Sequence, residues 1–125
     1  MTGAGIDVLR KYGLEGMQFT CIGPFLVADL LDQRWSFNDL PVGEFGLEAV
    51  ASGKCTQQHF HKNVSLYKTR ALDVKCRGDH FVLPQESLVV VLPGIAHSWV
   101  AKSLQAGLVG SVGHNHPKQI VQPIG

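Results

Sequence analysis

The sequence predicts a single all-β domain, built as an antiparallel sandwich or a small barrel. Its 125 residues are enough for one domain with a sizeable core. From Met17 onward, apolar segments of four to eight residues alternate with Gly, Pro, Asn and Asp, a texture typical of short strands joined by turns. The 14 glycines and 6 prolines, with a low charged fraction, argue against disorder and against a coiled coil.

One helix signal lies near the N-terminus. In Ile6–Gly13 the side chains of Val8, Leu9 and Tyr12 fall on one side of a helix, and Gly13 indicates its end. We expect one or two helical turns that form a short arm packed across the domain. The predicted divisions are an N-terminal arm, a barrel and a C-terminal tail, at residues 1–18, 19–108 and 109–125.

Ten segments are predicted to be strands, and their short connections favour antiparallel pairing. Periodicity allows a helix as an alternative for Phe25–Leu31. Leu88–Leu92 is apolar on both faces, so we expect a central strand there. The ten segments are Gln18–Ile22, Phe25–Leu31, Phe45–Ala51, Gln57–His61, Val64–Lys68, Ala71–Cys76, His80–Leu83, Leu88–Leu92, Ser98–Lys102 and Gly107–Val112.

The segment Leu72–Arg77 alternates strictly between apolar and charged residues. Leu72, Val74 and Cys76 should face the core, and the charged residues beside them should face outward. Arg77-Gly78-Asp79 then predicts a hairpin turn. Leu72, Val74, Val89, Val91 and Trp99 are the residues that we expect to be most buried.

Charge and cysteine content exclude several classes of protein. Eleven basic and ten acidic residues leave no surplus to neutralise a phosphate backbone, so no nucleic-acid partner is expected. Cys21, Cys55 and Cys76 are odd in number and show no CxxC spacing, which fits a reducing compartment better than a disulfide scaffold or a zinc finger. No apolar run is long enough to cross a membrane, and no signal peptide is visible. We expect a cytoplasmic protein without a membrane partner.

The high hydrophobic fraction and the low charged fraction predict that the protein associates with itself. A small barrel with 45% hydrophobic and only 17% charged residues has difficulty covering its outer sheet. We therefore expect a two-fold homodimer, with the N-terminal arm or an exposed edge strand at the contact.

Three histidines form the most informative pattern. His59 and His61 are separated by one residue on an expected strand, so their rings emerge on the same face. His97 follows the turn Leu92–Ala96 at the mouth of the expected central strand. Three imidazoles converging from one side would supply the ligands of a divalent metal ion. The alternative is a polar strand face beside an unrelated turn histidine.

The surroundings of these histidines resemble the two motifs of the cupin superfamily. Gly53–His61 has the pattern G-x-x-x-x-x-H-x-H, which resembles the first half of cupin motif one. Glu86–Trp99 is similar to motif two, with an apolar strand followed by P-G-x-x-H at Pro93–His97. The resemblance covers roughly residues 45 to 102 in family order. It implies a small single-domain cupin, a jelly-roll β-barrel that is often dimeric and binds a metal or small ligand inside.

The chain departs from the family pattern at the position of one ligand. Motif one normally supplies a glutamate a few residues after its second histidine, but Lys62–Tyr67 contains no acidic residue. Asn63 or Ser65 would stand in that place and would close the shell through a water. Motif two opens with Glu86-Ser87 where the family usually has Gly-Asp, which alters only a turn.

The expected site is therefore three neutral imidazoles with open positions for water or substrate. We expect His59, His61 and His97 to meet in the barrel interior, with ring nitrogens about 2.0–2.2 Å from any bound ion. The metal would be Zn, Fe, Ni or Cu, and its identity stays unresolved. The alternative is a site without metal, in which the histidines act as hydrogen-bond donors or as a general base.

Several other residues are candidates for the site or its surroundings. On an unbroken strand, Asn63, Ser65 and Tyr67 share the face of His59 and His61, so together with Trp99 they are expected to line the pocket. The remaining candidates are expected to be surface or small buried residues without a chemical role, and no catalytic residue is assigned. They are Cys55, Arg70, His80 and the second H-x-H, His114-Asn115-His116.

Three functions remain open. The first is a metal-dependent enzyme of the dioxygenase, isomerase or lyase type seen among cupins, acting on a small organic substrate. The second is a cupin that binds a small molecule without catalysis. The third is a metal-free sugar-nucleotide isomerase or epimerase, suggested by the run His59–Lys62, although only four arginines are present to hold a diphosphate. Fold alone does not decide among them.

Overall fold

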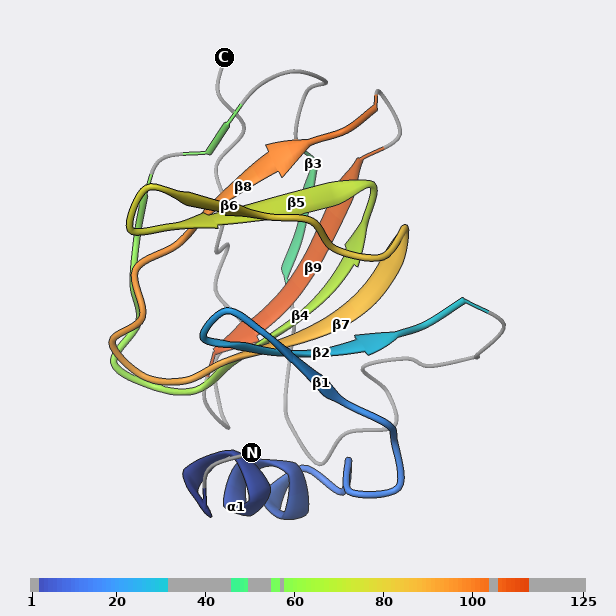
Figure 1. Cartoon of the computed structure of the whole chain (residues 1–125), viewed down its shortest axis with the longest axis vertical. Helices are drawn as coiled ribbons and strands as arrows, with labels where there is room; N and C mark the ends of the chain where they lie inside the picture. The colour runs from blue at the N-terminus through green and yellow to red at the C-terminus, as the bar shows by residue number, and fades with distance from the viewer. Residues whose placement is uncertain (1–2, 32–45, 50–54, 57, 104–105, 113–125) are drawn as a thin grey trace.

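The computed structural model describes residues 3–31, 46–49, 55–56, 58–103 and 106–112. These residues form one α-helix and nine strands in two antiparallel sheets (Figure 1). The predominantly β, antiparallel character predicted from the sequence is therefore confirmed. The elements are α1 (Gly3–Lys11), β1 (Thr20–Ile22), β2 (Phe25–Asp29), β3 (Gly46–Ala49), β4 (Ser65–Arg70), β5 (Leu72–Cys76), β6 (Asp79–Phe81), β7 (Glu86–Val91), β8 (Ser98–Ala101) and β9 (Gly107–Val112).

The larger sheet has the strand order β1-β2-β7-β4-β9-β3, and the smaller sheet has the order β6-β5-β8. The apolar strand β7 lies between β2 and β4, so its predicted central position is confirmed. Phe25–Asp29 is a strand and not the alternative helix. The last strand, β9, has the bounds predicted from the sequence, Gly107–Val112.

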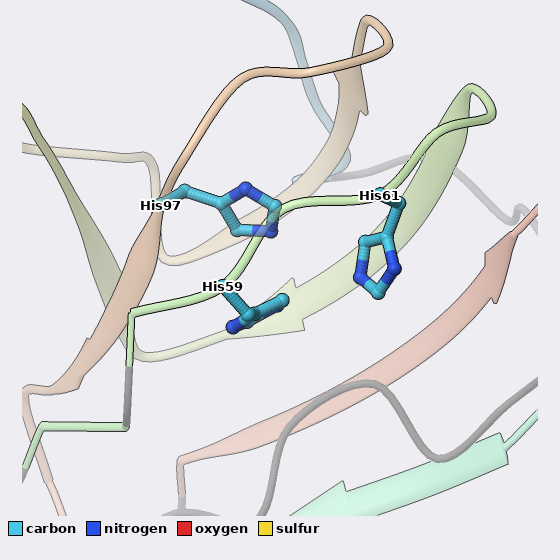
Figure 2. A group of neighbouring side chains, drawn as sticks. All are labelled: His59, His61 and His97. Carbon is cyan, nitrogen blue, oxygen red and sulfur yellow. The ribbon is translucent and has the colours of Figure 1, made fainter.

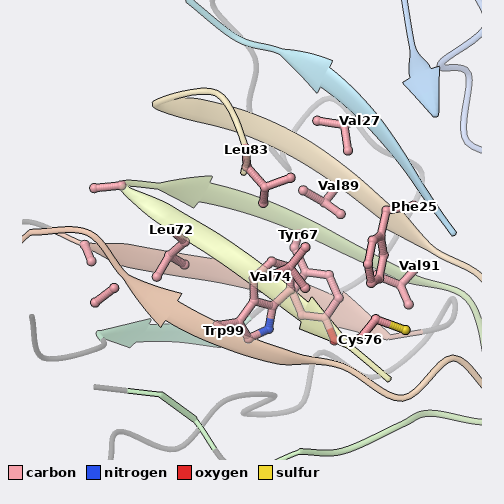
Figure 3. Packing of buried hydrophobic residues seen from close by; sticks show 13 residues of the cluster. Phe25, Val27, Tyr67, Leu72, Val74, Cys76, Leu83, Val89, Val91 and Trp99 are labelled. Atoms are coloured by element: carbon pink, nitrogen blue, oxygen red, sulfur yellow. The ribbon is translucent and has the colours of Figure 1, made fainter. Parts of the chain in front are cut away.

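Between the two sheets lies the main hydrophobic core (Figure 3). Leu72 and Trp99 from the smaller sheet meet Tyr67, Val89 and Val91 from the larger one, and all five are at most 1% exposed. Val74 is equally buried, so each of the five residues named as most buried from the sequence is inside. Full burial of one such apolar side chain contributes about 1.5–3 kcal/mol to stability.

A second apolar layer joins the helix to the outer face of the larger sheet. Leu9 of α1 and Tyr12, which directly follows the helix, are buried in one cluster with Leu26, Leu66 and Val90. Figure 1 shows the helix on the side of this sheet opposite to β5, β6 and β8. The predicted arm is thus a helix that covers one face of the sheet.

The helix ends where the sequence indicated. Gly13 adopts a positive φ of 68°, a conformation that glycine reaches without a steric cost from Cβ. The N–H of Leu14 donates to the carbonyl of Leu9 (2.7 Å), and the N–H of Gly13 donates to that of Arg10 (3.1 Å). These two bonds form a Schellman motif, and the buried side chains of Leu9 and Leu14 supply its usual hydrophobic contact.

The β5–β6 hairpin confirms the predicted turn and corrects one detail. Arg77 and Gly78, with φ of 52° and 84°, form a two-residue turn of the type I′ kind. Asp73 lies on the outer face of β5 but is only 8% exposed, whereas exposure was expected. The reason is long-range, because its carboxylate accepts hydrogen bonds from His80 Nε2 (2.8 Å) and pairs with Lys102 Nζ (2.9 Å).

One predicted strand is absent as a regular strand. Within Gln57–His61 the structure has an isolated bridge at His59, and a second bridge lies just outside the predicted segment at Cys55. The second H-x-H, His114 and His116, lies outside the described residues. In the parts of the chain that the structure describes, no helix is both long and apolar enough to cross a membrane.

We predict that the Asp73 cluster stabilises the fold in a pH-dependent way. Burial alone would raise the pKa of Asp73, but hydrogen bonds from His80, Lys102 and the Leu83 N–H outweigh it and lower the pKa. Asp73→Asn should therefore lower the free energy of unfolding by about 2 kcal/mol at pH 7. This difference in the free energy of unfolding has its maximum above the unfolded-state pKa of about 3.9. It disappears as the pH falls through the lower folded-state pKa.

Urea denaturation at pH 7 and near pH 2.5 measures this difference. Asp79→Asn removes an exposed carboxylate from β6 of the same hairpin and serves as the control, with little expected change at either pH. An equal loss of stability for Asp73→Asn at both pH values would contradict the prediction.

Candidate functional site

The three histidines are positioned by main-chain pairing of residues 55–56 and 58–61 with β8 and the segment that leads into it. His59 and His97 exchange both main-chain hydrogen bonds, from His59 N–H to the His97 carbonyl (3.0 Å) and back (2.8 Å). Farther along, the N–H of Gly94 donates to the carbonyl of His61 (2.8 Å). Since β8 is otherwise the edge of the smaller sheet, this segment extends that sheet at the position of the histidines.

A bulge sets the register of this pairing. Cys55 faces Val100 while His59 faces His97, so four steps along one segment match three along the other. On the same stretch, the N–H of Thr56 donates to the carbonyl of Trp99 (2.8 Å). In return, the N–H of Trp99 donates to the hydroxyl Oγ1 of Thr56 (2.8 Å), where a main-chain carbonyl would accept in a regular ladder.

Figure 2 shows the three imidazole rings grouped together. One ligand nitrogen from each of His59, His61 and His97 lies within 4.8 Å of the others. The ring centroids of His59 and His97 are 4.3 Å apart, and those of His59 and His61 are 5.1 Å apart. His97 is fully buried and the other two are half-buried. The predicted convergence of the three histidines is confirmed.

The tautomer of His97 follows from its two hydrogen bonds. Its Nδ1 lies 2.8 Å from the carbonyl of Ile95, which can only accept, so Nδ1 carries the proton. Nε2 therefore presents a lone pair, and the hydroxyl of Tyr67 donates to it (3.0 Å). Burial lowers the pKa of His97 to about 3, with a smaller contribution from His59 and His61, against the opposing effect of the Ile95 carbonyl. The ring is neutral at pH 7, as a metal ligand must be.

Buried aromatic rings surround His97. The ring centroids of Tyr67, Trp99 and Phe25 lie 5.5, 5.6 and 6.3 Å from that of His97, and all three side chains are fully buried. Figure 3 shows Tyr67 and Trp99 side by side, with ring centroids 4.8 Å apart. Burial raises the pKa of Tyr67 far above its ordinary value of 10, so its hydroxyl stays protonated. Among these three aromatic neighbours of His97, the Tyr67 hydroxyl is the group that hydrogen-bonds to its ring.

Of the four residues expected to line a pocket, three are buried and one is exposed. Ser65 and Tyr67 are buried on β4, and Trp99 is buried on β8. Asn63 is exposed, because the chain bends at residues 62–63 before β4 begins and does not continue as a strand from His61. Arg70, which was expected at the surface, is exposed and ion-paired with Glu86 (3.0 Å).

Sequence reasoning missed two contributions to the site. The hydroxyl of Thr56 fixes the main chain beside the site, and the carbonyl of Ile95 orients the ring of His97. Neither group is a metal ligand, so no sequence motif marks it. The sequence indicates the proline-glycine turn before His97. It does not indicate that the ring of His97 donates a hydrogen bond to the carbonyl of Ile95, two residues earlier.

The chemistry of the three side chains fits a divalent transition metal. Two nitrogens bound to one tetrahedral ion at 2.0–2.1 Å lie about 3.3 Å apart, so modest ring rotations from separations of up to 4.8 Å would bring them into place. The Nδ1–H bond of His97 to a main-chain carbonyl is the outer hydrogen bond that metal-binding histidines ordinarily make. No carboxylate or thiolate joins the group among the residues described.

Comparison with models of known protein families and with curated protein sequences finds no match for this chain. Family and function therefore rest on the residues and their geometry.

We predict that the hydroxyl of Thr56 holds the segment that carries His59 and His61 against β8. Thr56→Val keeps the branched shape but leaves the buried N–H of Trp99 without its acceptor, a loss of about 1–3 kcal/mol. Amide hydrogen exchange at His59 and His97 should become roughly tenfold faster or more.

Thr56→Ser is the matched control, because it retains the accepting oxygen. Its exchange rates should stay close to those of the unmodified chain. Equal rates in the valine and serine variants would show that the hydroxyl does not hold this segment.

Proposed function

We propose that the protein is a small cupin, a jelly-roll β-barrel in which His59, His61 and His97 bind one divalent transition metal ion beside a small organic ligand. Two antiparallel sheets with a shared core between them support the barrel. The order of elements supports the family, since the H-x-H segment pairs beside β8 and the P-G turn connects β7 to His97.

One observation carries the metal site. Three imidazoles from two separate segments bring their nitrogens within 4.8 Å, and the buried one is held as the neutral Nδ1–H tautomer, which leaves Nε2 with a lone pair. Three neutral histidines with no protein carboxylate are a known donor set of catalytic zinc sites and suit iron, nickel and copper as well. The metal therefore stays unassigned within this set.

The residues at the site also indicate the kind of chemistry. A bound divalent ion would act as a Lewis acid toward a carbonyl or carboxylate oxygen. The rings of Phe25, Tyr67 and Trp99 would exclude water from one side, and the Tyr67 hydroxyl would offer one hydrogen bond. These groups favour a metal-dependent enzyme of the dioxygenase, isomerase or lyase type that acts on a small organic substrate. A protein that binds a small molecule without catalysis would use the same groups.

We predict that the chain, stripped with EDTA, binds one equivalent of Co(II) or Zn(II). His97→Ala should weaken binding by at least about a hundredfold, because two imidazoles are too few to retain most divalent ions. His59→Ala should do the same at a half-buried position, where the fold is less sensitive than at the fully buried His97. Isothermal titration and the visible spectrum of Co(II) measure the affinity, and circular dichroism checks the fold.

Two controls address histidines elsewhere. His80→Ala removes an exposed ring that contacts Asp73 on the outer face of the smaller sheet, and should leave binding unchanged. The double change of His114 and His116 to alanine tests the second H-x-H of the sequence. Retention of the ion by a folded His59→Ala variant, or no binding by the unmodified chain, would refute the proposed site.

A further inference from the structure

The hydroxyl of Tyr67 occupies the atom of His97 that a metal would need. Nδ1 of His97 is committed to the carbonyl of Ile95, so Nε2 is the one ring nitrogen with a lone pair. That lone pair accepts the hydrogen bond from Tyr67, at 3.0 Å between the heavy atoms. A ligand bond from Nε2 and this hydrogen bond exclude each other, so loading of the site requires that Tyr67 release His97.

Tyr67 cannot withdraw into solvent after that release. Its main chain is paired on both sides within the larger sheet, with Val89 of β7 and Gly110 of β9. Its ring is fully buried and packs against Trp99, with ring centroids 4.8 Å apart. The hydroxyl therefore stays next to the ring of His97 and needs a new acceptor, since an unsatisfied buried hydroxyl is costly. The hydroxyl of Ser65, two residues away on the same strand, also lies within hydrogen-bond reach of Tyr67, but it is neutral and brings no charge to the site.

The charge of the site indicates what that acceptor is. Three neutral imidazoles leave a divalent ion with its full charge, and no carboxylate of the described chain belongs to the group. Asp73, which is the buried carboxylate of the smaller sheet, is committed to His80 and Lys102 on the outer face. A charge held among buried aromatic rings is unfavourable unless an opposite charge accompanies it. An anionic oxygen from the ligand would supply that charge and accept from Tyr67.

We propose that Tyr67 is a positioning residue with two partners: it holds Nε2 of His97 in the metal-free protein and donates to an anionic oxygen of the ligand in the metal-loaded protein. The ligand class that follows is a small carboxylate. This inference rests on the metal site proposed above and adds to it the charge of the ligand and the residue that recognises it.

Tyr67→Phe should therefore change two affinities in opposite directions. Without the competing hydrogen bond, Co(II) alone should bind about fivefold more tightly, since a net hydrogen bond of ordinary strength is removed from the metal-free state only. Acetate should bind the Co(II)-loaded variant about tenfold more weakly than the loaded unmodified chain, because the donor to its charged oxygen is lost. If the substitution only disturbed the packing of the site, the affinities for Co(II) and for acetate would both fall.

The experiment is a pair of titrations on the full chain, followed by the visible spectrum of Co(II). Co(II) is added first, and acetate or acetamide is then added to the loaded protein. Acetamide has the shape of acetate without its charge, so it should bind far more weakly. Tyr12→Phe is the matched control, because Tyr12 is a buried tyrosine in the layer between α1 and the larger sheet. It should leave both affinities unchanged.

The outcomes separate this inference from the metal site. If the unmodified chain binds Co(II) but Tyr67→Phe leaves both affinities unchanged or weakens both, the role of Tyr67 is wrong and the metal site stands. Equal binding of acetate and acetamide overturns the ligand class. If the unmodified chain does not bind Co(II), both proposals fall.

A measurement on the unmodified chain covers the case in which the variant does not fold. Nitrogen-15 spectra of the metal-free protein should show His97 protonated at Nδ1, with Nε2 as a hydrogen-bond acceptor. Zn(II) should shift the Nε2 resonance and the hydroxyl proton of Tyr67 together. A proton on Nε2, or a Tyr67 hydroxyl signal that does not respond to zinc, overturns the inference.

Discussion

The reciprocal main-chain pair between His59 and His97 is the contact on which the candidate site depends. In an antiparallel pair of this kind the two Cα atoms lie about 5.5 Å apart and both side chains emerge on one face. His61 follows two residues later and is tied to Gly94 by its carbonyl. If the pair were shifted by one residue, one of the two rings would turn to the opposite face and the cluster would be lost.

That pair lies beside a region where buried polar groups are concentrated. His97, Tyr67 and Trp99 are fully buried, and the first two satisfy each other. Among the described residues, Trp99 Nε1 and Thr69 Oγ1 are buried without a hydrogen-bond partner. Each such group costs about 1–3 kcal/mol relative to a satisfied one. Local departures of this kind from an optimal core are expected where a site needs particular chemistry more than stability.

Local sequence pattern explains much of the fold. The alternation in Leu72–Cys76 and the turn at Arg77-Gly78 give one hairpin directly, and the apolar run around Val89 gives a central strand. The convergence of the three histidines was also predictable, because an H-x-H pair and a histidine after a P-G turn each have a local signature. The jelly-roll closure and the family are proposals that rest on the two sequence motifs and on the order of the strands.

The details that the sequence did not reveal depend on distant partners. Asp73 is buried because Lys102 reaches it from beyond the end of β8, which no local pattern encodes. The bulge beside Thr56 arises from pairing with β8, and it replaces the regular strand expected at Gln57–His61. Asn63 is exposed because the chain bends at residues 62–63, so its position on an ideal strand did not apply.

The central claim, that three imidazoles hold one ion, is tested most directly by X-ray absorption on the zinc-loaded full chain. We expect a first shell of three imidazole nitrogens at about 2.0 Å with one or more additional light atoms and no sulfur. The absence of sulfur matters because the half-buried thiol of Cys55 lies on the same segment as His59 and His61. A sulfur contribution, or a shell that contains fewer than three imidazoles, would contradict the claim.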